Sequence, residues 1–119
     1  MQYMLLIYQD PTTAPAPDSP EAQENFAAWM RISEEMAPVT VSGAPLQGTE
    51  TATTVRANGS GDAVLSDGPF AETKEILGGY YIIDVPDLDT ATQWAARLPN
   101  VARGGSTEVR PVMEFPGLT

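Results

Sequence analysis

Two segments of this chain are apolar on both of their alternating faces, and that pattern limits the possible folds more than any other feature. Residues 3–8 read YMLLIY, and residues 79–85 read GYYIIDV. Successive side chains of a strand point to opposite faces, so strands of this kind must be covered on both sides. A sheet built on these two segments therefore needs a covering layer on each face.

Two helices are expected to supply one of these layers. Ser19 is a favourable N-cap with Pro20 at the first helical position, and Pro38 closes this helix. Its apolar stripe, at a period of 3.6 residues, is Phe26, Trp29, Met30, Ser33, Met36 and Ala37. Asp87 caps the second helix, and Pro99 ends it. The buried stripe of this second helix is Leu88, Ala91, Ala95 and Leu98, with Trp94 at its margin.

Several other segments have the pattern of strands joined by turns. We expect a strand at residues 39–46 and another at residues 51–57. The second of these runs through the turn NGSGD into residues 63–65 and forms a hairpin. A final strand is expected at residues 107–115. Pro111 within it lacks the N–H donor of a sheet ladder, so this strand should lie at an edge of the sheet.

The order of these elements is βα-β-hairpin-β-αβ, in a single domain of residues 1–119. It predicts an α+β fold of the ferredoxin-like βαββαβ type with an inserted hairpin, in which two helices cover one face of an antiparallel sheet. The second apolar face carries Met4, Leu6, Tyr8, Tyr80 and Ile82. We expect a second copy of the chain to cover it, sheet against sheet, in a homodimer. The pattern leaves open which of the two faces meets the helices.

The composition excludes several kinds of chemistry and several partners. The 119 residues include no histidine and no cysteine, which rules out Ser-His-Asp and Cys-His catalysis and leads us to expect no metal and no cofactor. A net charge of −10 disfavours nucleic acid and anionic membranes as partners. The longest apolar run, residues 3–8, is far shorter than the roughly 20 residues that span a bilayer. We therefore expect a cytoplasmic protein.

The segment from Asp67 to Glu75 reads DGPFAETKE and resembles the signature of the DGPF family of YCII-related proteins. Further blocks similar to this family follow the same order along the chain, at residues 3–8, 78–81, 85–89, 103–106 and 108–112. The resemblance implies a dimeric α+β barrel made of ferredoxin-like halves. The expected activity of the wider YCII group rests on a His–Asp pair, which this chain does not have because it lacks histidine.

The DGPF-like segment contains the candidate catalytic residues Asp67, Glu72 and Lys74. Asp67 would act as a general base or a ligand-binding carboxylate, with Glu72 beside it to separate the pKa values of the pair. The alternative is a plain turn, in which Asp67 caps its own backbone and Phe70 fills the core. Lys74 is the only lysine. It would hold a carboxylate or phosphate of a substrate, or form a solvated ion pair with Glu72 or Glu75.

The candidate substrate-binding residues are Tyr80, Phe70 and Arg103. One of Tyr80 and Tyr81 should pack under the helices, and the other should present its phenol to a pocket on the dimer side. Arg103 and the two glycines that follow it would form a small anion-binding nest, or a flexible connection from helix to strand. Arg110 lies with Glu108 on the non-apolar face of the last strand and is expected to form a cross-strand salt bridge.

Two functions fit these residues. The first is a cofactor-free acid/base enzyme or a binder of a small polar or aromatic molecule, with the Asp67 loop at the site. The resemblance supports it, because dimeric α+β barrels include small oxygenases, isomerases and dechlorinases. The alternative is a non-catalytic ligand-sensing or regulatory protein, for example a partner of an extracytoplasmic-function sigma factor, beside which relatives are often encoded. The surroundings of Asp67 would separate the two.

Overall fold

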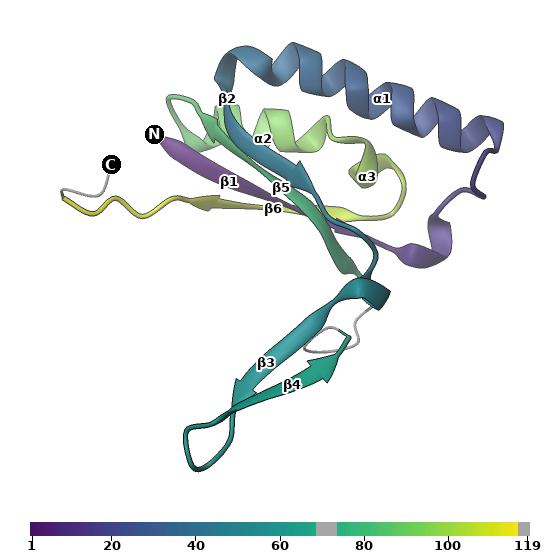
Figure 1. The fold of residues 1–119 in the computed structure, drawn as a ribbon. Helices are drawn as coiled ribbons and strands as arrows, with labels where there is room; N and C mark the ends of the chain where they lie inside the picture. Colours follow the sequence, from purple (N-terminus) through teal and green to yellow (C-terminus); the bar gives the residue numbers. More distant parts are fainter. Residues whose placement is uncertain (69–73, 117–119) are drawn as a thin grey trace.

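Four antiparallel strands form the main sheet, in the order β2-β5-β1-β6 (Figure 1). The computed structural model describes residues 1–68 and 74–116. The strands of this sheet are β1 (Gln2–Gln9), β2 (Thr40–Pro45), β5 (Ile76–Asp84) and β6 (Ser106–Pro111). The topology is consistent with the predicted ferredoxin-like fold. The two strands that are apolar on both faces, β1 and β5, occupy the centre of the sheet.

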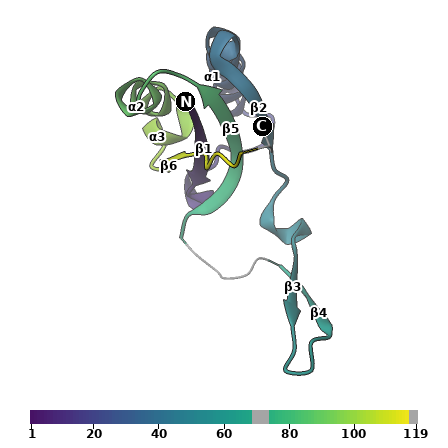
Figure 2. The same cartoon turned by 90° about the vertical axis from the view of Figure 1, so that its left-hand side faces the viewer.

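Within the described residues, the α-helices all cover the same face of this sheet (Figures 1 and 2). They are α1 (Pro20–Met36), α2 (Leu88–Ala96) and α3 (Pro99–Ala102), with short 3-10 turns η1 (Pro11–Thr13), η2 (Ala37–Val39) and η3 (Thr49–Thr51) in the connections. Both predicted N-caps are confirmed. The Ser19 hydroxyl accepts a hydrogen bond from the Ala22 N–H, and the Asp87 carboxylate accepts one from the Thr90 N–H at 2.8 Å.

The core lies between the helices and one face of β1 and β5. Its buried apolar residues are Tyr3, Leu5, Ile7, Ile32, Met36, Ile83, Val85, Ala91, Ala95 and Leu98. The face of β1 that meets the helices is therefore the one with Tyr3, Leu5 and Ile7. Met4, Leu6 and Tyr8 lie on the opposite, open face and are half-buried. There, Leu6 pairs with Tyr80 and Met4 pairs with Ile82 across the β1–β5 ladder, so the predicted second apolar face is confirmed.

The predicted apolar stripe of α1 is wrong in part. The helix buries Ile32 and Met36, whereas Phe26 is 67% exposed and Met30 is 57% exposed. Both residues line a cleft together with Gly43, Ala44 and Pro45, the small residues of β2. Ala37 is exposed as well and belongs to η2 rather than to the helix.

The second helix differs from its prediction at both ends. Ala91, Ala95 and Leu98 are buried as expected, but Leu88 is 53% exposed because it occupies the first position of α2. Pro99 does not end α2, which stops at Ala96. Pro99 is the first residue of α3, where its missing N–H would have no helical partner in any case.

A two-stranded hairpin of β3 (Thr53–Ala57) and β4 (Ala63–Asp67) projects away from the main sheet (Figures 1 and 2). This confirms the predicted hairpin and extends its second strand to Asp67. The radius of gyration is 16.6 Å, compared with ~13.5 Å for a compact domain of this length. The large value reflects this projecting arm, on which Val55 and Leu65 are exposed on the same side.

The edges of the sheet agree with the prediction for Pro111. The last strand, β6, pairs with β1 alone and ends at Pro111, shorter than the predicted residues 107–115.

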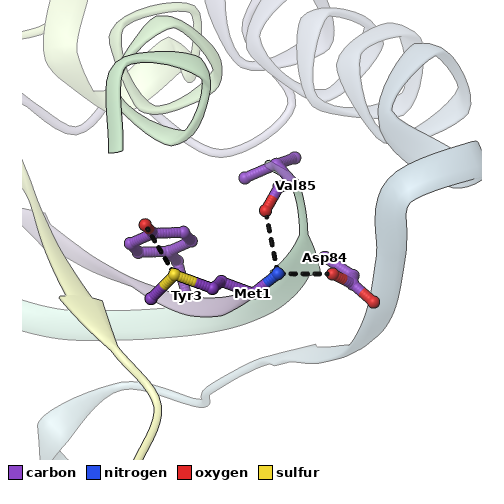
Figure 3. Close-up of polar contacts among 4 residues, drawn as sticks. All are labelled: Met1, Tyr3, Asp84 and Val85. Atoms are coloured by element: carbon purple, nitrogen blue, oxygen red, sulfur yellow. Dashed lines mark hydrogen bonds and ion pairs between the residues drawn. The ribbon is translucent and has the colours of Figure 1, made fainter. Parts of the chain in front are cut away.

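At the start of the chain, the Met1 amine contacts the Asp84 carboxylate and the Val85 carbonyl oxygen, both at 3.1 Å, while the Tyr3 hydroxyl donates to the Met1 sulfur (Figure 3). These contacts join the beginning of β1 to the end of β5.

Candidate functional site

An apolar cleft of about 440 Å³ lies between α1 and the β2–β5 part of the sheet. It is lined by Ile7, Gln9, Phe26, Trp29, Met30, Ser33, Gly43, Ala44, Pro45, Gly78, Gly79, Tyr80 and Tyr81. Four of these residues are aromatic, although the Tyr80 side chain itself belongs to the open face of the sheet, and none of these lining residues is charged. A concave, mostly apolar site with a few polar groups is typical of small-molecule binding sites.

The cleft exists because small residues face large ones across it. From the sheet side, β2 contributes Gly43, Ala44 and Pro45, and β5 contributes Gly78 and Gly79. The strands approach too closely for a larger residue at two of these positions. A Cβ atom on Gly43 would lie 2.8 Å from the Tyr80 carbonyl oxygen, and one on Gly79 would lie 2.8 Å from the Ala44 carbonyl oxygen. The floor of the cleft is therefore bare backbone, and the long side chains of α1 form its roof.

One hydrogen-bonded pair of hydroxyl groups lies in the wall of the cleft. The Ser33 Oγ of α1 and the Tyr81 hydroxyl of β5 are 2.6 Å apart, and either atom can be the donor. Two hydroxyls carry two protons, and their mutual bond uses one of them. The other proton and the remaining lone pairs are available to a bound molecule. This pair can therefore donate to a carbonyl or accept from a hydroxyl group.

The chemistry of the cleft favours an uncharged ligand. A charged group that leaves water for an apolar site needs an opposite charge or several hydrogen bonds there. The lining residues offer hydroxyl groups, the Gln9 amide and backbone groups instead. Within the described residues, moreover, no group of three or more Asp or Glu residues could hold a metal ion, and no helix is long and apolar enough to cross a membrane.

Of the predicted site residues that the structure describes, only Tyr80 is among those that line this cleft. Asp67 is exposed at the end of β4, at the base of the projecting hairpin. Its neighbour Gly68 has a φ of +93°, donates its N–H to the Ala52 carbonyl and accepts a hydrogen bond from the Thr54 hydroxyl. The turn at Gly68 is thus held by backbone and threonine contacts. Phe70 and Glu72 lie outside the described residues.

Lys74 lies elsewhere, on an open depression along β1 and β6. It is exposed there beside Tyr8, Ser106 and Glu108. Its charge also contributes to lowering the pKa of Asp10, although the larger causes are the hydrogen bonds that Asp10 accepts from the Thr12 hydroxyl and the Thr12 N–H. Lys74 therefore lies on the surface near the η1 connection rather than in the cleft.

Arg103 follows α3, in a closely packed connection to β6. Gly104 has a φ of +86°, the Gly105 N–H donates to the Asn100 carbonyl oxygen, and a Cβ on Gly105 would collide with the Tyr8 carbonyl oxygen. The Arg103 guanidinium donates to the Glu21 carbonyl at 3.5 Å. The cross-strand salt bridge predicted for Arg110 is wrong in its geometry, because Arg110 pairs with Glu108 of the same strand, β6.

The sequence pattern places the four α1 residues of the cleft on the apolar stripe of that helix. Phe26, Trp29, Met30 and Ser33 fell on the apolar stripe of α1, and Tyr81 was one of the two tyrosines with alternating faces. Tyr81 is the tyrosine that faces the helices, as its contact with Ser33 shows. The signal that could have indicated a site is Ser33, a hydroxyl residue in the middle of an otherwise apolar stripe.

Together, the four-stranded sheet, the helices on one face and the cleft beneath α1 define an α+β domain with room for a small molecule. Residues 1–116 match the YCII-related domain family. The chain is 36% identical over 115 residues to an uncharacterised protein of Rhizobium meliloti (strain 1021), an alignment that covers 94% of this chain and 92% of that protein. The chain belongs to the YCII-related domain family.

A solved structure with a similar fold is the 5-chloro-2-hydroxyhydroquinone dehydrochlorinase of Burkholderia phenoliruptrix, in complex with 2,5-dihydroxybenzoquinone. The TM-score is 0.54 at 17% sequence identity, over 97% of this chain and 96% of that chain. At this level of identity the likeness concerns the fold.

Proposed function

We propose that this protein binds a small, flat, uncharged aromatic molecule in the cleft beneath α1. The observation that carries the proposal is the composition of the cleft wall, in which Phe26 and Trp29 accompany the Ser33–Tyr81 hydroxyl pair and no lining residue is charged. Aromatic walls favour a flat ring by stacking and by edge-to-face contact. The hydroxyl pair would orient the ring through a hydroxyl or carbonyl substituent.

The fold comparison supports this ligand class. The dehydrochlorinase of similar fold is named for a chlorinated hydroxyhydroquinone, and its structure holds a dihydroxybenzoquinone. Both are small rings with hydroxyl or carbonyl substituents, which is the chemistry that the Ser33–Tyr81 pair can bind. A quinone would use the free proton of the pair, and a phenol would use a lone pair.

Acid/base catalysis on such a ligand is the second candidate, and we propose Asp67 as its general base. The lining residues themselves include no carboxylate. However, the DGPF-like segment runs directly into β5, whose Gly78 and Gly79 form part of the cleft floor. In this proposal Glu72 and Lys74 assist Asp67, and Tyr80, Phe70 and Arg103 contact the substrate. The same segment is the reason to place the chain in the DGPF subtype.

We also propose that the protein is a homodimer, in which the open faces of two sheets pack together to form an α+β barrel. The support is the row of half-buried apolar residues on that face, where Leu6 and Tyr80 are neighbours. Sedimentation should give about twice the monomer mass of 12.7 kDa. Leu6→Glu should give a monomer, and a wild-type protein that sediments as a monomer would contradict the proposal.

The regulatory alternative, a sigma-factor partner, has no observation in its favour.

Binding is tested by titration with hydroquinone, with benzoate as a matched anionic control. The chain has two tryptophans, so a Trp94→Phe background leaves Trp29 in the cleft wall as the fluorescent reporter. We expect hydroquinone to change Trp29 emission in a saturable way and benzoate to bind at least tenfold more weakly. Equal response to both compounds, or to neither, would refute the proposed ligand class.

The proposed general base is tested separately. Asp67→Asn should keep hydroquinone binding and abolish any turnover.

A further inference from the structure

Gln9, the last residue of β1, places its side-chain amide over β5 at one end of the cleft. The position of this amide is defined by Gly78 of β5, which lines the cleft as well. A Cβ atom on Gly78 would lie 2.7 Å from the Cδ and Oε1 atoms of Gln9 and 3.0 Å from its Nε2 atom. The amide therefore occupies the space that a side chain at position 78 would need.

The Gln9 amide is accessible and has no partner. Within the described residues it forms no hydrogen bond, although the residue is half-buried. In the same part of the chain, the buried side-chain nitrogen and oxygen atoms without a partner belong to Asn25 and Asn100 alone. The polar atoms of Gln9 are therefore not enclosed by the packing. Because an amide has both a donor end and an acceptor end, it can bond to a hydroxyl or a carbonyl group.

The Gln9 amide and the Ser33–Tyr81 hydroxyl pair mark opposite ends of the cleft. On β5, Gly78 and Tyr81 are three residues apart, or roughly 10 Å at the rise of a strand. On α1, Trp29 precedes Ser33 by one turn. Trp29 lies at the Gln9 end, since both of these residues also line a smaller cavity of about 90 Å³ beyond the cleft. Both walls thus run from the amide to the hydroxyl pair.

The space between these two ends is apolar. Apart from Gln9, Ser33 and the two tyrosines, the lining residues are glycine or largely apolar. A ring that lies there can hydrogen-bond to side chains only at its two ends. A para-substituted ring with one hydrogen bond of about 2.8 Å at each end spans roughly 10 Å. An ortho pair of substituents reaches one end alone.

We propose that Gln9 is a specificity-determining residue of the cleft, which selects aromatic rings with polar substituents at opposite ends. One substituent bonds to the Ser33–Tyr81 pair, and the other bonds to the Gln9 amide. Gly78 acts indirectly, because its missing side chain leaves room for the amide. This inference rests on the proposed function and deepens it, since a cleft that binds any small aromatic ring would not need Gln9.

The test compares hydroquinone with catechol, its ortho isomer, and with phenol, which has a single hydroxyl group. Binding is followed by Trp29 fluorescence in the Trp94→Phe background. We expect the wild-type cleft to bind hydroquinone about tenfold more tightly than either of the others, the effect of one additional hydrogen bond. Equal affinity for the three compounds would overturn the role of Gln9 and leave the proposed function standing. Absence of binding by all three would contradict the proposed function itself.

Gln9→Leu removes the amide and keeps a side chain of similar size. It should lower the affinity for hydroquinone to that of phenol and leave the affinity for phenol unchanged. Gly78→Ala should have the same effect without changing Gln9, because the new Cβ displaces the amide. Gln23→Leu, the same change as at Gln9 but at an exposed position of α1, should leave the preference intact.

Thermal unfolding of each variant shows whether it is folded before its affinities are compared. Two results would overturn the assignment. The first is a folded Gln9→Leu or Gly78→Ala variant that keeps the preference for hydroquinone. The second is an equal loss of hydroquinone and phenol affinity, which would mean that Gln9 shapes the cleft and does not select the second substituent.

Discussion

The two long helices lie on the same face of the sheet, yet they meet it in different ways. Helix α2 packs through Ala91 and Ala95, and Leu98, which precedes α3, is buried beside them. Helix α1 buries Ile32 and Met36 near its C-terminal end, whereas Phe26 and Met30 stand exposed above the cleft. In Figure 2, α2 is seen at the left, and α1 is seen at the right, near β2.

This difference separates the part of the domain that stabilises the fold from the part that leaves room for a ligand. Small alanines let α2 approach the sheet closely, so little space remains between them. The large side chains of α1 face Gly43 and Gly79, and neither partner fills the gap. Changes in the closed half should therefore act on stability, and changes in the open half should act on binding.

The largest effect is expected from Leu98→Ala, compared with Met30→Ala. Leu98 is 1% exposed, so the change should lower the free energy of unfolding by ~3 kcal/mol through lost burial and a residual cavity. Met30→Ala removes an exposed side chain and should cost less than ~1 kcal/mol. Urea denaturation of both variants measures the two values. Similar losses would mean that the two halves do not differ in the way described.

A smaller effect is expected at the hydroxyl pair in the open half. Tyr81→Phe removes the 2.6 Å contact with Ser33 and should cost ~1 kcal/mol of stability, the typical net value of one hydrogen bond. Its effect on hydroquinone affinity should be larger, at least fivefold, because the ligand loses its orienting group. Ser33→Ala should reproduce both changes, and the double variant should add little to either. A stability loss without any loss of affinity would assign the pair to the core instead.

The smallest effect concerns the pH dependence of α2. Hydrogen bonds from the Thr90 N–H and hydroxyl hold the pKa of Asp87 below its ordinary value. A carboxylate whose pKa is lowered by folding stabilises the protein above its unfolded pKa, and this contribution is lost as the pH falls through the lower folded value. The contribution of Asp87 should therefore begin to be lost below about pH 4.

Asp87→Asn tests this assignment, because asparagine also caps helices but does not titrate in this range. The variant should unfold at nearly the same urea concentration as the wild type at pH 7, with a weaker loss of stability below about pH 4. An unchanged acid profile would place the responsible carboxylate elsewhere. Asp10, whose pKa is also lowered, is the next candidate.

Local signals in the sequence predicted those parts of the fold that depend on neighbouring residues. Ser19 and Asp87 each satisfy an N–H three residues away, and the NGSGD turn closes its hairpin within a few residues. The position of Pro111 followed from its missing donor alone. The two apolar faces of β1 and β5 are likewise a local signal, and they agree with the central place of these strands in the sheet.

The depth of burial and the cleft could not be predicted in this way. The period of 3.6 residues shows which side of α1 is apolar, but Phe26 and Met30 are exposed because the strand below them offers only small residues. The cleft depends on α1 and β2 together, and these segments are separate in the chain. The strand pattern predicted that Tyr80 and Tyr81 point to opposite faces, whereas Asp67 drew attention through its distinctive segment and lies on the exposed hairpin.

The tip of that hairpin has a practical consequence. The Asn58 side chain accepts hydrogen bonds from the Ser60 and Asp62 N–H groups, and Gly61 has a φ of +85°, so the turn is closed by its own residues. It stands well away from the helices (Figure 1). A peptide epitope or a protease recognition sequence inserted after Gly59 would therefore be displayed in solvent while the main sheet and both cavities stay intact. The arm offers a ready attachment point for engineering.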